Sequence, residues 1–427
     1  MNKDDKKIKL SILGSFGFMD IGDEAMLSED LYFILNFLKI PRKNIFLYGG
    51  NPEYISYYHE HPQENCFDDS LLRDEYYRIQ SSPRKRIMAK IKEIRKDLIQ
   101  NILYTNKNKC NGSKVLMKQM ALNALKISDA ILITGGGTIN TRDREGRSLT
   151  RMYTLLKYFH TLRKPVFISG QTIGPLGLYI EHDQMAREII EFADVLTVRD
   201  SLYSRRYLSI INCKPKRFIE TFDDAYTLPY ETEGLPEDLI TFINTRKSFA
   251  INITDYIADS PEQKKYIANL CEEIIKIYDV NIVLISHTLK DYYSLTIIRD
   301  MISNPLKERL KLPDTRFWRA NKLKKLISSC RLAVGGRYHF IIFAGTSNTP
   351  FIGLCGNHYS YIKQDGFART LGMENFILTE KETFDLPIVL SRINDALKTH
   401  LNISDKFKRT SLSMEIFGEW ISALKGK

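Results

Sequence analysis

Short apolar runs recur through the first half of the chain, separated by stretches long enough to form helices. Each run is bounded by glycine, proline or polar turn residues, a pattern typical of buried strands. We predict strands at 9–13, 44–48, 130–134, 165–169, 195–198 and 217–219. Because strands that alternate with helices build parallel sheets with helices on both faces, this half is predicted to be a parallel α/β domain.

The same alternation returns in the second half, after a break rich in acidic and turn residues at 229–245. Strands are expected there at 249–253, 281–286, 332–335 and 350–353, with helices at 261–278 and 320–329. We therefore expect an N-terminal domain over 1–232 and a C-terminal domain over 246–400. The last piece, 401–427, contains an amphipathic helix that could pack on either domain.

One segment, 83–118, interrupts this rhythm with a strongly basic amphipathic helix. Its basic residues are Arg84, Lys85, Arg86, Lys90, Lys92, Arg95 and Lys96. Ile87, Ile91 and Ile94 recur among them at helical spacing. Two interpretations stay open: a surface helix whose apolar stripe covers the N-terminal core, or peripheral contact with an anionic membrane at the inner face.

Composition narrows the class of protein. The 427 residues are 43% hydrophobic and 26% charged, which is ordinary for a globular protein. The first apolar stretch is broken by Gly14, too soon for a secretion signal, and no apolar run is long enough to cross a bilayer. The six cysteines form no C-x-x-C pair, which favours reduced thiols. We expect a cytoplasmic protein.

The formal net charge of +11 is compatible with nucleic acid, anionic lipid or small anions as ligands. No nucleic-acid-binding motif accompanies the charge, so no nucleic-acid partner is expected. His59 and His61 have no third ligand at a suitable spacing, so no metal site is expected either. The oligomeric state stays open, and a homo-oligomer is compatible with the sequence.

Acidic residues follow the first predicted strand, at the sheet edge where parallel sheets bind ligands. Asp20, Asp23 and Glu24 lie there at the start of a helix, behind glycines that permit close backbone approach. Carboxylates suit sugar hydroxyls better than a phosphate, and they suit capping of the helix equally well.

Glycine-rich turns follow the next predicted strands. Gly135, Gly136, Gly137 and Thr138 come directly after the strand at 130–134 and predict a backbone nest for an anion or an oxygen ligand. Three glycines in a row are hard to explain by packing alone, because each costs conformational entropy on folding.

Polar residues also end the remaining strands of the first half. Gln171 lies in a glycine-flanked turn after the strand at 165–169. Arg199 follows the strand at 195–198, where it would clamp a carboxylate or phosphate, or pair with a neighbouring acid.

In the second half, Arg337 and His339 follow the strand at 332–335 and open a helix. This places a permanent cation and a titratable proton donor at one helix N-terminus. An isolated histidine is usually structural, but an Arg-x-His sequence after two glycines favours chemistry.

Taken in order, these segments resemble the polysaccharide pyruvyl transferase family, from about residue 10 to residue 375. The matching pieces are Gly22-Asp23-Glu24-Ala25, Gly135-Gly136-Gly137-Thr138, Gly170-Gln171-Thr172-Ile173-Gly174-Pro175, Val198-Arg199-Asp200, Asp223-Asp224-Ala225-Tyr226 and Gly336-Arg337-Tyr338-His339. No single piece is specific, whereas the ordered set is.

The resemblance implies a glycosyltransferase-B-like arrangement of two Rossmann-like domains around a central cleft, with the acceptor on the N-terminal side and the donor on the C-terminal side. It implies transfer of the enolpyruvyl group of phosphoenolpyruvate onto two sugar hydroxyls, which gives a pyruvate ketal and phosphate. No cofactor is needed. The implied acceptor is a surface polysaccharide glycan or its lipid-linked oligosaccharide precursor.

Carried over by position, Arg199 and Arg337 would hold the phosphate and carboxylate of phosphoenolpyruvate, and His339 would be the general acid. The lysine of the family corresponds to Lys363 if four residues are inserted near 355–360. Two positions depart from the family: Asp20 stands where asparagine is usual, and Tyr338 where leucine is usual.

Two other functions are compatible with these residues. One is a glycosyltransferase of the same fold that uses a nucleotide-sugar donor. The other is a membrane-docked, catalytically silent partner in glycan assembly, which the basic segment would serve and the retained Arg199, Arg337 and His339 argue against.

Overall fold

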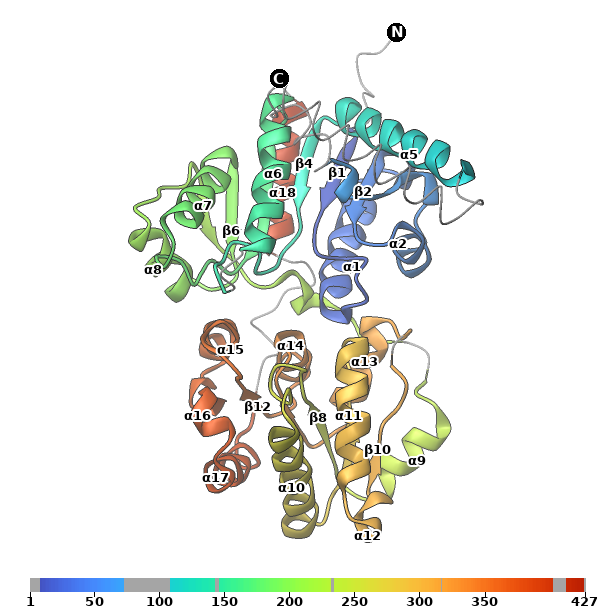
Figure 1. The fold of residues 1–427 in the computed structure, drawn as a ribbon, viewed down its shortest axis with the longest axis vertical. Coiled ribbons are helices and arrows are strands. Elements are labelled where there is room, and N and C mark those ends of the chain that lie inside the picture. Colours follow the sequence, from blue (N-terminus) through green and yellow to red (C-terminus); the bar gives the residue numbers. More distant parts are fainter. Residues whose placement is uncertain are drawn as a thin grey trace.

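Two α/β domains lie one above the other in the computed structural model (Figure 1). The structure describes residues 8–72, 108–142, 146–231, 234–315, 317–401 and 412–425. The basic residues of the predicted helix within 83–118 lie outside the described residues, so both interpretations of that helix remain predictions.

The N-terminal domain is built on a seven-stranded sheet in the order β3-β2-β1-β4-β5-β6-β7, with every neighbouring pair parallel. Its strands are β1 (Leu10–Leu13), β2 (Ile45–Gly49), β3 (Cys66–Asp68), β4 (Ala130–Ile133), β5 (Val166–Gln171), β6 (Val195–Val198) and β7 (Phe218–Glu220). The order is doubly wound, with β1 and β4 in the middle, so the loops after these two strands lie side by side.

Among the described residues of this domain, the helices that connect the strands are α1 (Ile21–Asn36), α2 (Pro52–His59), α5 (Asn108–Ile127), α6 (Arg147–Thr161), α7 (Ile180–Phe192) and α8 (Leu202–Ile210). Side-chain caps set where the first two begin. The Asp20 carboxylate accepts from Gly22 N, and Asn51 accepts from Glu53 N and Tyr54 N. Short 3-10 turns occur at η1 (Arg42–Asn44), η2 (Gln63–Asn65) and η3 (Asp224–Thr227).

The C-terminal domain repeats the plan with a six-stranded parallel sheet in the order β10-β9-β8-β11-β12-β13. Its strands are β8 (Ser248–Asn252), β9 (Asn281–Leu284), β10 (Leu310–Lys311), β11 (Leu332–Gly335), β12 (Phe351–Leu354) and β13 (Ile377–Leu378). Its helices are α9 (Glu237–Thr245), α10 (Pro261–Tyr278), α11 (Leu289–Met301), α12 (Asn304–Lys307), α13 (Ala320–Ser328), α14 (Tyr338–Gly345), α15 (His358–Leu371), α16 (Glu380–Thr383) and α17 (Leu386–Ala396), with the 3-10 turn η4 (Glu374–Phe376) before β13.

The ten predicted strands are confirmed, and β6 and β11 match their predicted bounds to the residue. The sequence missed β3, β10 and β13, which are three, two and two residues long. All three are edge strands or lie at a sheet margin, and such short runs carry no measurable hydrophobic period.

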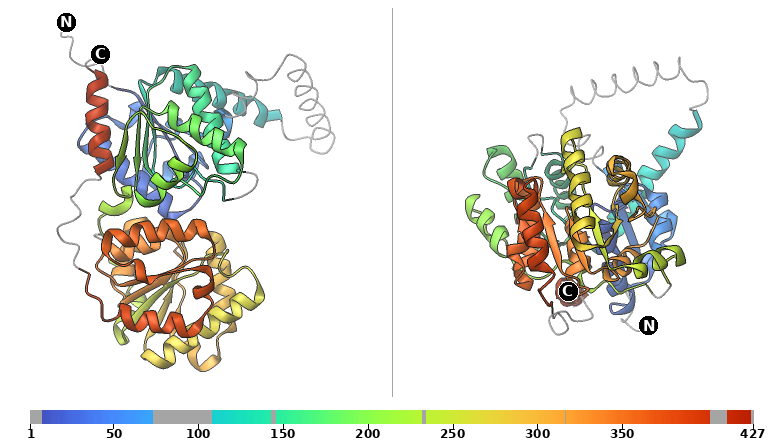
Figure 2. Two further views of the ribbon diagram at one scale, coloured as in Figure 1. Left: turned by 90° about the vertical axis from the view of Figure 1, so that its left-hand side faces the viewer. Right: turned by 90° about the horizontal axis from the view of Figure 1, so that it is seen from below.

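The last helix, α18 (Leu412–Lys425), returns to the N-terminal domain, a choice that the sequence left open (Figure 2). Phe417 and Trp420 pack against Phe167 of β5, with ring centroids 5.2 and 5.6 Å away. The Ser413 hydroxyl also bonds those of Ser169 and Thr197 inside this domain. The apolar face of α18 therefore completes the core on one side of the first sheet.

One hydrophobic cluster joins the two domains. Ile21, Ala25 and Met26 of α1 belong to the same buried cluster as Tyr338 and Phe340 of α14. Because α1 and α14 both follow central strands of their sheets, this contact brings the carboxyl ends of the two sheets to a common interface. None of the described helices is both long and apolar enough to cross a membrane.

Candidate active site between the two domains

A cavity of about 1040 Å³, called here the basic cavity, lies between the two domains. Its described lining holds six basic and three acidic side chains. They are Arg142, Arg151, Arg199, Lys290, Arg337 and Lys363, with Asp20, Asp23 and Asp255. A concave site with an excess of positive charge suits an anionic ligand.

Arg199 follows β6 and is almost fully buried, with 2% of its surface exposed. Its Nε donates to Thr172 Oγ1 at 2.8 Å, and its Nη1 donates to Asp223 Oδ2 at 2.5 Å. The guanidinium also stacks on the Tyr338 ring, 4.2 Å from the centroid. Tyr338 thus offers a π face from the opposite domain, which the leucine usual at this position would lack.

His339 lies in the first turn of α14 and contacts the N-terminal domain directly. Its Nε2 is 3.6 Å from Asp223 Oδ2, within ion-pair range but too far for a regular hydrogen bond, and it has no hydrogen-bond partner within the described chain. The other side of the ring packs on Gly22, where an added Cβ would lie 2.0 Å from His339 Nδ1. Gly22 is therefore needed for the imidazole to approach helix α1.

Asp223 stands between the two candidate catalytic groups, since one of its oxygens faces both Arg199 and His339. Burial alone would raise the pKa of Asp223, but the charges of His339 and Arg199 outweigh burial and hold this pKa below its ordinary value. Asp223 is thus a permanent anion that orients both partners.

Arg337 precedes α14 and is held on one side by a bidentate pair with Asp291, at 2.9 and 2.7 Å. Its Nη1 lies 3.6 Å from Asp20 Oδ2, across the domain interface. Asp20 therefore caps α1 and also pairs with Arg337. The asparagine usual at this position could cap the helix in the same way but would carry no charge for the arginine.

Lys363 lies in α15 and lines the basic cavity. Its Nζ is 4.3 Å from the Tyr359 ring centroid and 5.6 Å from that of Tyr338. Burial, followed by the charges of Arg199 and Arg142, lowers the pKa of Lys363 to about 7. This amine can therefore gain or lose a proton near neutral pH.

Asp23 also lines the basic cavity, on the side of the N-terminal domain. Burial raises the pKa of Asp23 well above its ordinary value, and the neighbouring Asp20 and Glu24 carboxyls add to the effect. Asp23 is therefore a better proton acceptor than an ordinary carboxylate once it is ionised.

The glycine-rich turn after β4 contributes Gly136, Gly137 and Thr138 to the lining. Gly136 has a φ of +154°, and an added Cβ on Gly137 would lie 2.1 Å from the Tyr359 hydroxyl. That hydroxyl donates to Gly137 O at 2.7 Å from the other domain. Glycine at 137 is thus explained by the close approach of α15.

Two residues predicted to bind substrate do not face the basic cavity. Gln171 is fully buried: its Nε2 donates to Thr134 O at 2.9 Å, and its Oε1 accepts from Thr138 Oγ1 at 3.1 Å. Gly135 packs near Met26 and Asp224 and does not line the basic cavity. Both shape the turn instead of facing a ligand.

Glu24 is the clearest departure from the predicted substrate contacts. It is fully buried, accepts from Gly17 N at 2.7 Å and lies 2.8 Å from His59 Nε2. Burial raises the pKa of Glu24 to about 8. Helix periodicity explains this position: Asp23 and Glu24 are neighbours in sequence, so they point to different sides of α1.

The sequence missed four residues that complete the site. His287 follows β9, and its position at a strand end was a usable signal. Asp291 belongs to the capping box at the start of α11, so only its contact with Arg337 shows its second role. Arg142 and Arg151 lie after the glycine-rich turn and in α6, away from any strand end, where no sequence pattern marked them.

Among the described residues, no group of three or more His, Cys, Asp or Glu side chains is arranged to hold a metal ion.

Two parallel-sheet domains around a ligand-sized cavity define a glycosyltransferase-B-like protein. UDP-GlcNAc 2-epimerase of Neisseria meningitidis shares the fold with a TM-score of 0.57 at 11% identity, covering 97% of this chain and 99% of that one. The Methanocaldococcus jannaschii epimerase gives 0.54 at 15%, covering 98% and 99%. The Anabaena protein HepE, solved with UDP and glucose, gives 0.54 at 12%, covering 98% and 100%. These likenesses show the fold alone.

Residues 20–358 match the polysaccharide pyruvyl transferase family, and the chain belongs to that family. The match covers both domains and includes Arg199, Arg337 and His339. No curated protein sequence matches the chain significantly.

Proposed function

We propose that this protein transfers the enolpyruvyl group of phosphoenolpyruvate onto two hydroxyls of a sugar. The acceptor class we propose is a surface polysaccharide or its lipid-linked precursor, met in the cytoplasm. The observation that carries the proposal is convergence: Arg199 from one domain and Arg337, His339 and Lys363 from the other line a single cavity. Phosphoenolpyruvate is a small trianion, and such a cluster would neutralise it.

The proposed reaction begins with protonation of the donor. His339 gives a proton to C3 of phosphoenolpyruvate, so C3 becomes a methyl group and C2 becomes electrophilic. The first sugar hydroxyl forms a bond to C2, and its proton returns to His339. Arg199 and Arg337 would hold the phosphate and carboxylate throughout.

The second half of the reaction releases phosphate. The bond between C2 and the phosphate oxygen breaks, and the second sugar hydroxyl closes the ring at C2. Its proton leaves with the departing phosphate as HPO₄²⁻, so atoms and charge balance. Asp223, which faces both Arg199 and His339, would stabilise the protonated imidazole before the first step.

The direct test is phosphate release from phosphoenolpyruvate by His339→Gln with a panel of glycosides as acceptors. We expect a loss of about 100-fold or more in kcat, because the general acid is removed. Binding of phosphoenolpyruvate, followed by calorimetry, should persist because both arginines remain. A variant with wild-type turnover would eliminate His339 as the acid.

A second candidate is a glycosyltransferase with a nucleotide-sugar donor, favoured by the fold shared with proteins solved with UDP or UDP-GlcNAc. It predicts saturable binding of a UDP-sugar or GDP-sugar and no phosphate release from phosphoenolpyruvate. Measuring both on one preparation separates the two functions.

A further inference from the structure

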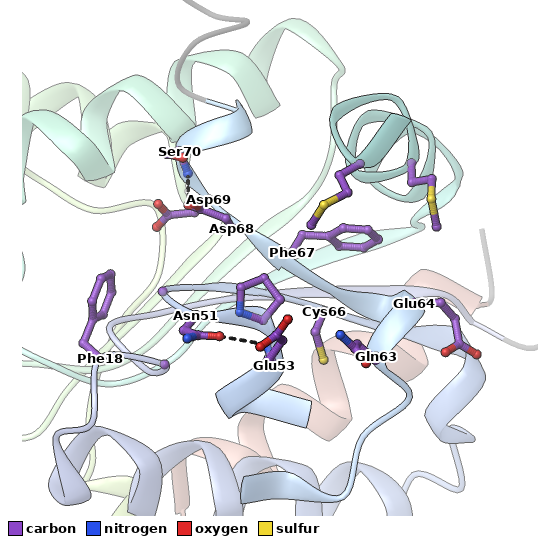
Figure 3. Close-up of a pocket in the computed structure, with 15 residues that line it drawn as sticks. Phe18, Asn51, Glu53, Gln63, Glu64, Cys66, Phe67, Asp68, Asp69 and Ser70 are labelled. Carbon is purple, nitrogen blue, oxygen red and sulfur yellow. Dashed lines mark hydrogen bonds between the residues drawn. The ribbon is translucent and has the colours of Figure 1, made fainter. Parts of the chain in front are cut away.

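A second cavity, of about 1130 Å³ and called here the acidic cavity, lies within the N-terminal domain. It is formed by the loop after β1, the start of α2, strand β3 with its following loop, and one face of α5. Figure 3 shows Phe18 at one end of it and Gln63 and Glu64 at the other. This volume is slightly above the ~300–1,000 Å³ range of small-molecule sites, so the cavity can hold more than one sugar ring.

The chemistry of this lining differs from that of the basic cavity. Four carboxyl groups line it, from Glu53, Glu64, Asp68 and Asp69, and its described lining contains no arginine or lysine. In a chain with a formal net charge of +11, that lining is unexpected. A phosphate, a phospholipid headgroup or an acidic sugar would be repelled here.

Hydrogen-bonding groups alternate with apolar surfaces around the acidic cavity. Glu53, Gln63 and Glu64 are exposed at its wall, while Phe18, 57% exposed, offers an aromatic surface. Met117 and Met120 of α5 add apolar surface, each about two-fifths exposed (41% and 39%). A ligand with many hydroxyls on an apolar ring fits this combination, because carboxylates accept from hydroxyls and rings cover C–H faces.

The acidic cavity adjoins the basic cavity. Phe18 lines both, and the ion pair between Asp69 and Arg151 joins a residue of each lining. The guanidinium of Arg151 also lies over the Phe18 ring, 5.2 Å from the centroid. The sheet order is β3-β2-β1-β4. The loops that follow β3, β2 and β1 line the acidic cavity, and the loop that follows β4 is the glycine-rich turn of the basic cavity, so the two linings are neighbours along the same sheet edge.

We propose that the acidic cavity is a binding subsite for uncharged or amino sugars that extend from the sugar receiving the pyruvyl group. The inference rests on the proposed function for the identity of the reacting sugar. It makes the acceptor an oligosaccharide or longer glycan, with at least one further sugar held on the side of β2 and β3. The geometry assigns the donor to the basic cavity and the glycan chain to the acidic one.

The test compares acceptors of two lengths: methyl hexopyranosides and methyl disaccharides with the same hexose at the non-reducing end. We expect kcat/KM for phosphate release to be about tenfold higher with the disaccharide, a difference that one additional subsite readily provides. Equal values for both lengths would overturn the subsite.

Two variants probe the acidic cavity without touching the basic one. Gln63→Trp places a bulky ring at the wall of the cavity and should reduce the preference for the disaccharide, leaving kcat/KM for the methyl hexopyranoside unchanged. Glu53→Gln keeps the shape and an oxygen acceptor but removes the charge, and should lower the preference by roughly threefold, because the hydrogen bond is weakened and not lost. Glu237→Gln is the matched control, since Glu237 also follows a proline at a helix start and lines neither cavity.

The subsite can also be tested without enzymatic activity, so a failure of the proposed function and a failure of the subsite can be told apart. If no acceptor releases phosphate, ligand-observed NMR with the same saccharides still tests the subsite. Binding that is present in the wild type and lost in Gln63→Trp supports it. Absent binding, or binding unchanged in that variant, overturns it.

Discussion

The basic cavity and the acidic cavity are close in size, at about 1040 and 1130 Å³, but they differ in origin and charge. The basic cavity lies between two domains and draws Arg199 from one and Arg337 and Lys363 from the other. The acidic cavity lies inside one domain and holds four carboxyl groups.

The difference in charge suits the two cavities to two different kinds of ligand, an anion and a neutral glycan. In the proposed function the donor is a small trianion, and the cations that would neutralise it come from both domains. A neutral glycan has no charge to neutralise and needs a preformed surface with many hydrogen-bond acceptors. Opposite charges in neighbouring cavities would also direct an anionic donor away from the proposed glycan subsite.

The largest expected effect is loss of the central cation in the basic cavity. Arg199→Gln should reduce kcat/KM for phosphoenolpyruvate by about 100- to 1000-fold, as removal of one preorganised donor does elsewhere. Binding of saccharides in the acidic cavity should be unaffected. Steady-state phosphate release and saccharide NMR on the same protein measure both.

Stability must be followed in parallel for Arg199→Gln. The substitution leaves Asp223 buried without its cation, which is strongly destabilising in general. Arg199→Lys keeps the charge and tests geometry alone, and Arg205→Gln, at an exposed position on α8, is the control. An Arg199→Gln protein that folds and turns over normally would show that Arg199 does not hold the donor.

A smaller effect is expected from pH. Because the pKa of Lys363 is lowered to about 7, its amine is mostly neutral above that pH, and a bound trianion should raise the pKa again. Binding phosphoenolpyruvate above pH 7 then takes up a proton, so Kd should rise by up to about tenfold per pH unit. Below pH 7 the amine is already charged, and its contribution to the slope should vanish.

Calorimetry in buffers of different ionisation enthalpy measures this proton uptake directly. Lys363→Met should bind more weakly at pH 6 and lose this part of the pH dependence. Lys290→Gln should keep it, because the Lys290 side chain is 80% exposed. If the pH dependence of Kd for phosphoenolpyruvate persists in Lys363→Met, the proton is taken up by another group. Saccharide binding should not show this pH dependence.

The smallest effect concerns Tyr338, the departure from the family that contacts Arg199. Tyr338→Leu removes the ring and should raise KM for phosphoenolpyruvate by roughly three- to tenfold, the range of one cation–π contact. Tyr338→Phe keeps the ring and should behave like the wild type. Identical KM values for the leucine variant and the wild type would show that the stacking does not support donor binding.

The candidate-site residues that could be predicted from the sequence are those that directly follow a strand. Arg199, Arg337, His339, Asp20 and the glycines at 136–137 all follow predicted strands, and the topology brings them to one cavity. Position after a strand does not decide which way a side chain points, which is why Glu24 and Gln171 turned inward to hold loops.

The acidic cavity could not be predicted from the sequence, because its lining comes from elements that are far apart in the chain. It depends on β3, a three-residue edge strand without a detectable period, and on α5, which begins about 40 residues further along the chain. Glu53, Gln63 and Met117 belong to different elements, so no local spacing connects them.

By itself the sequence determined the alternation of strands and helices, because burial imposes a period that can be read locally. It also determined the ordered glycine, arginine and histidine residues at strand ends. Only the tertiary structure decided that α18 returns to the first domain, that Asp223 faces both Arg199 and His339, and that two cavities of opposite charge adjoin. These depend on packing between elements distant in the chain, where contacts and burial are set by the whole fold and not by neighbouring residues.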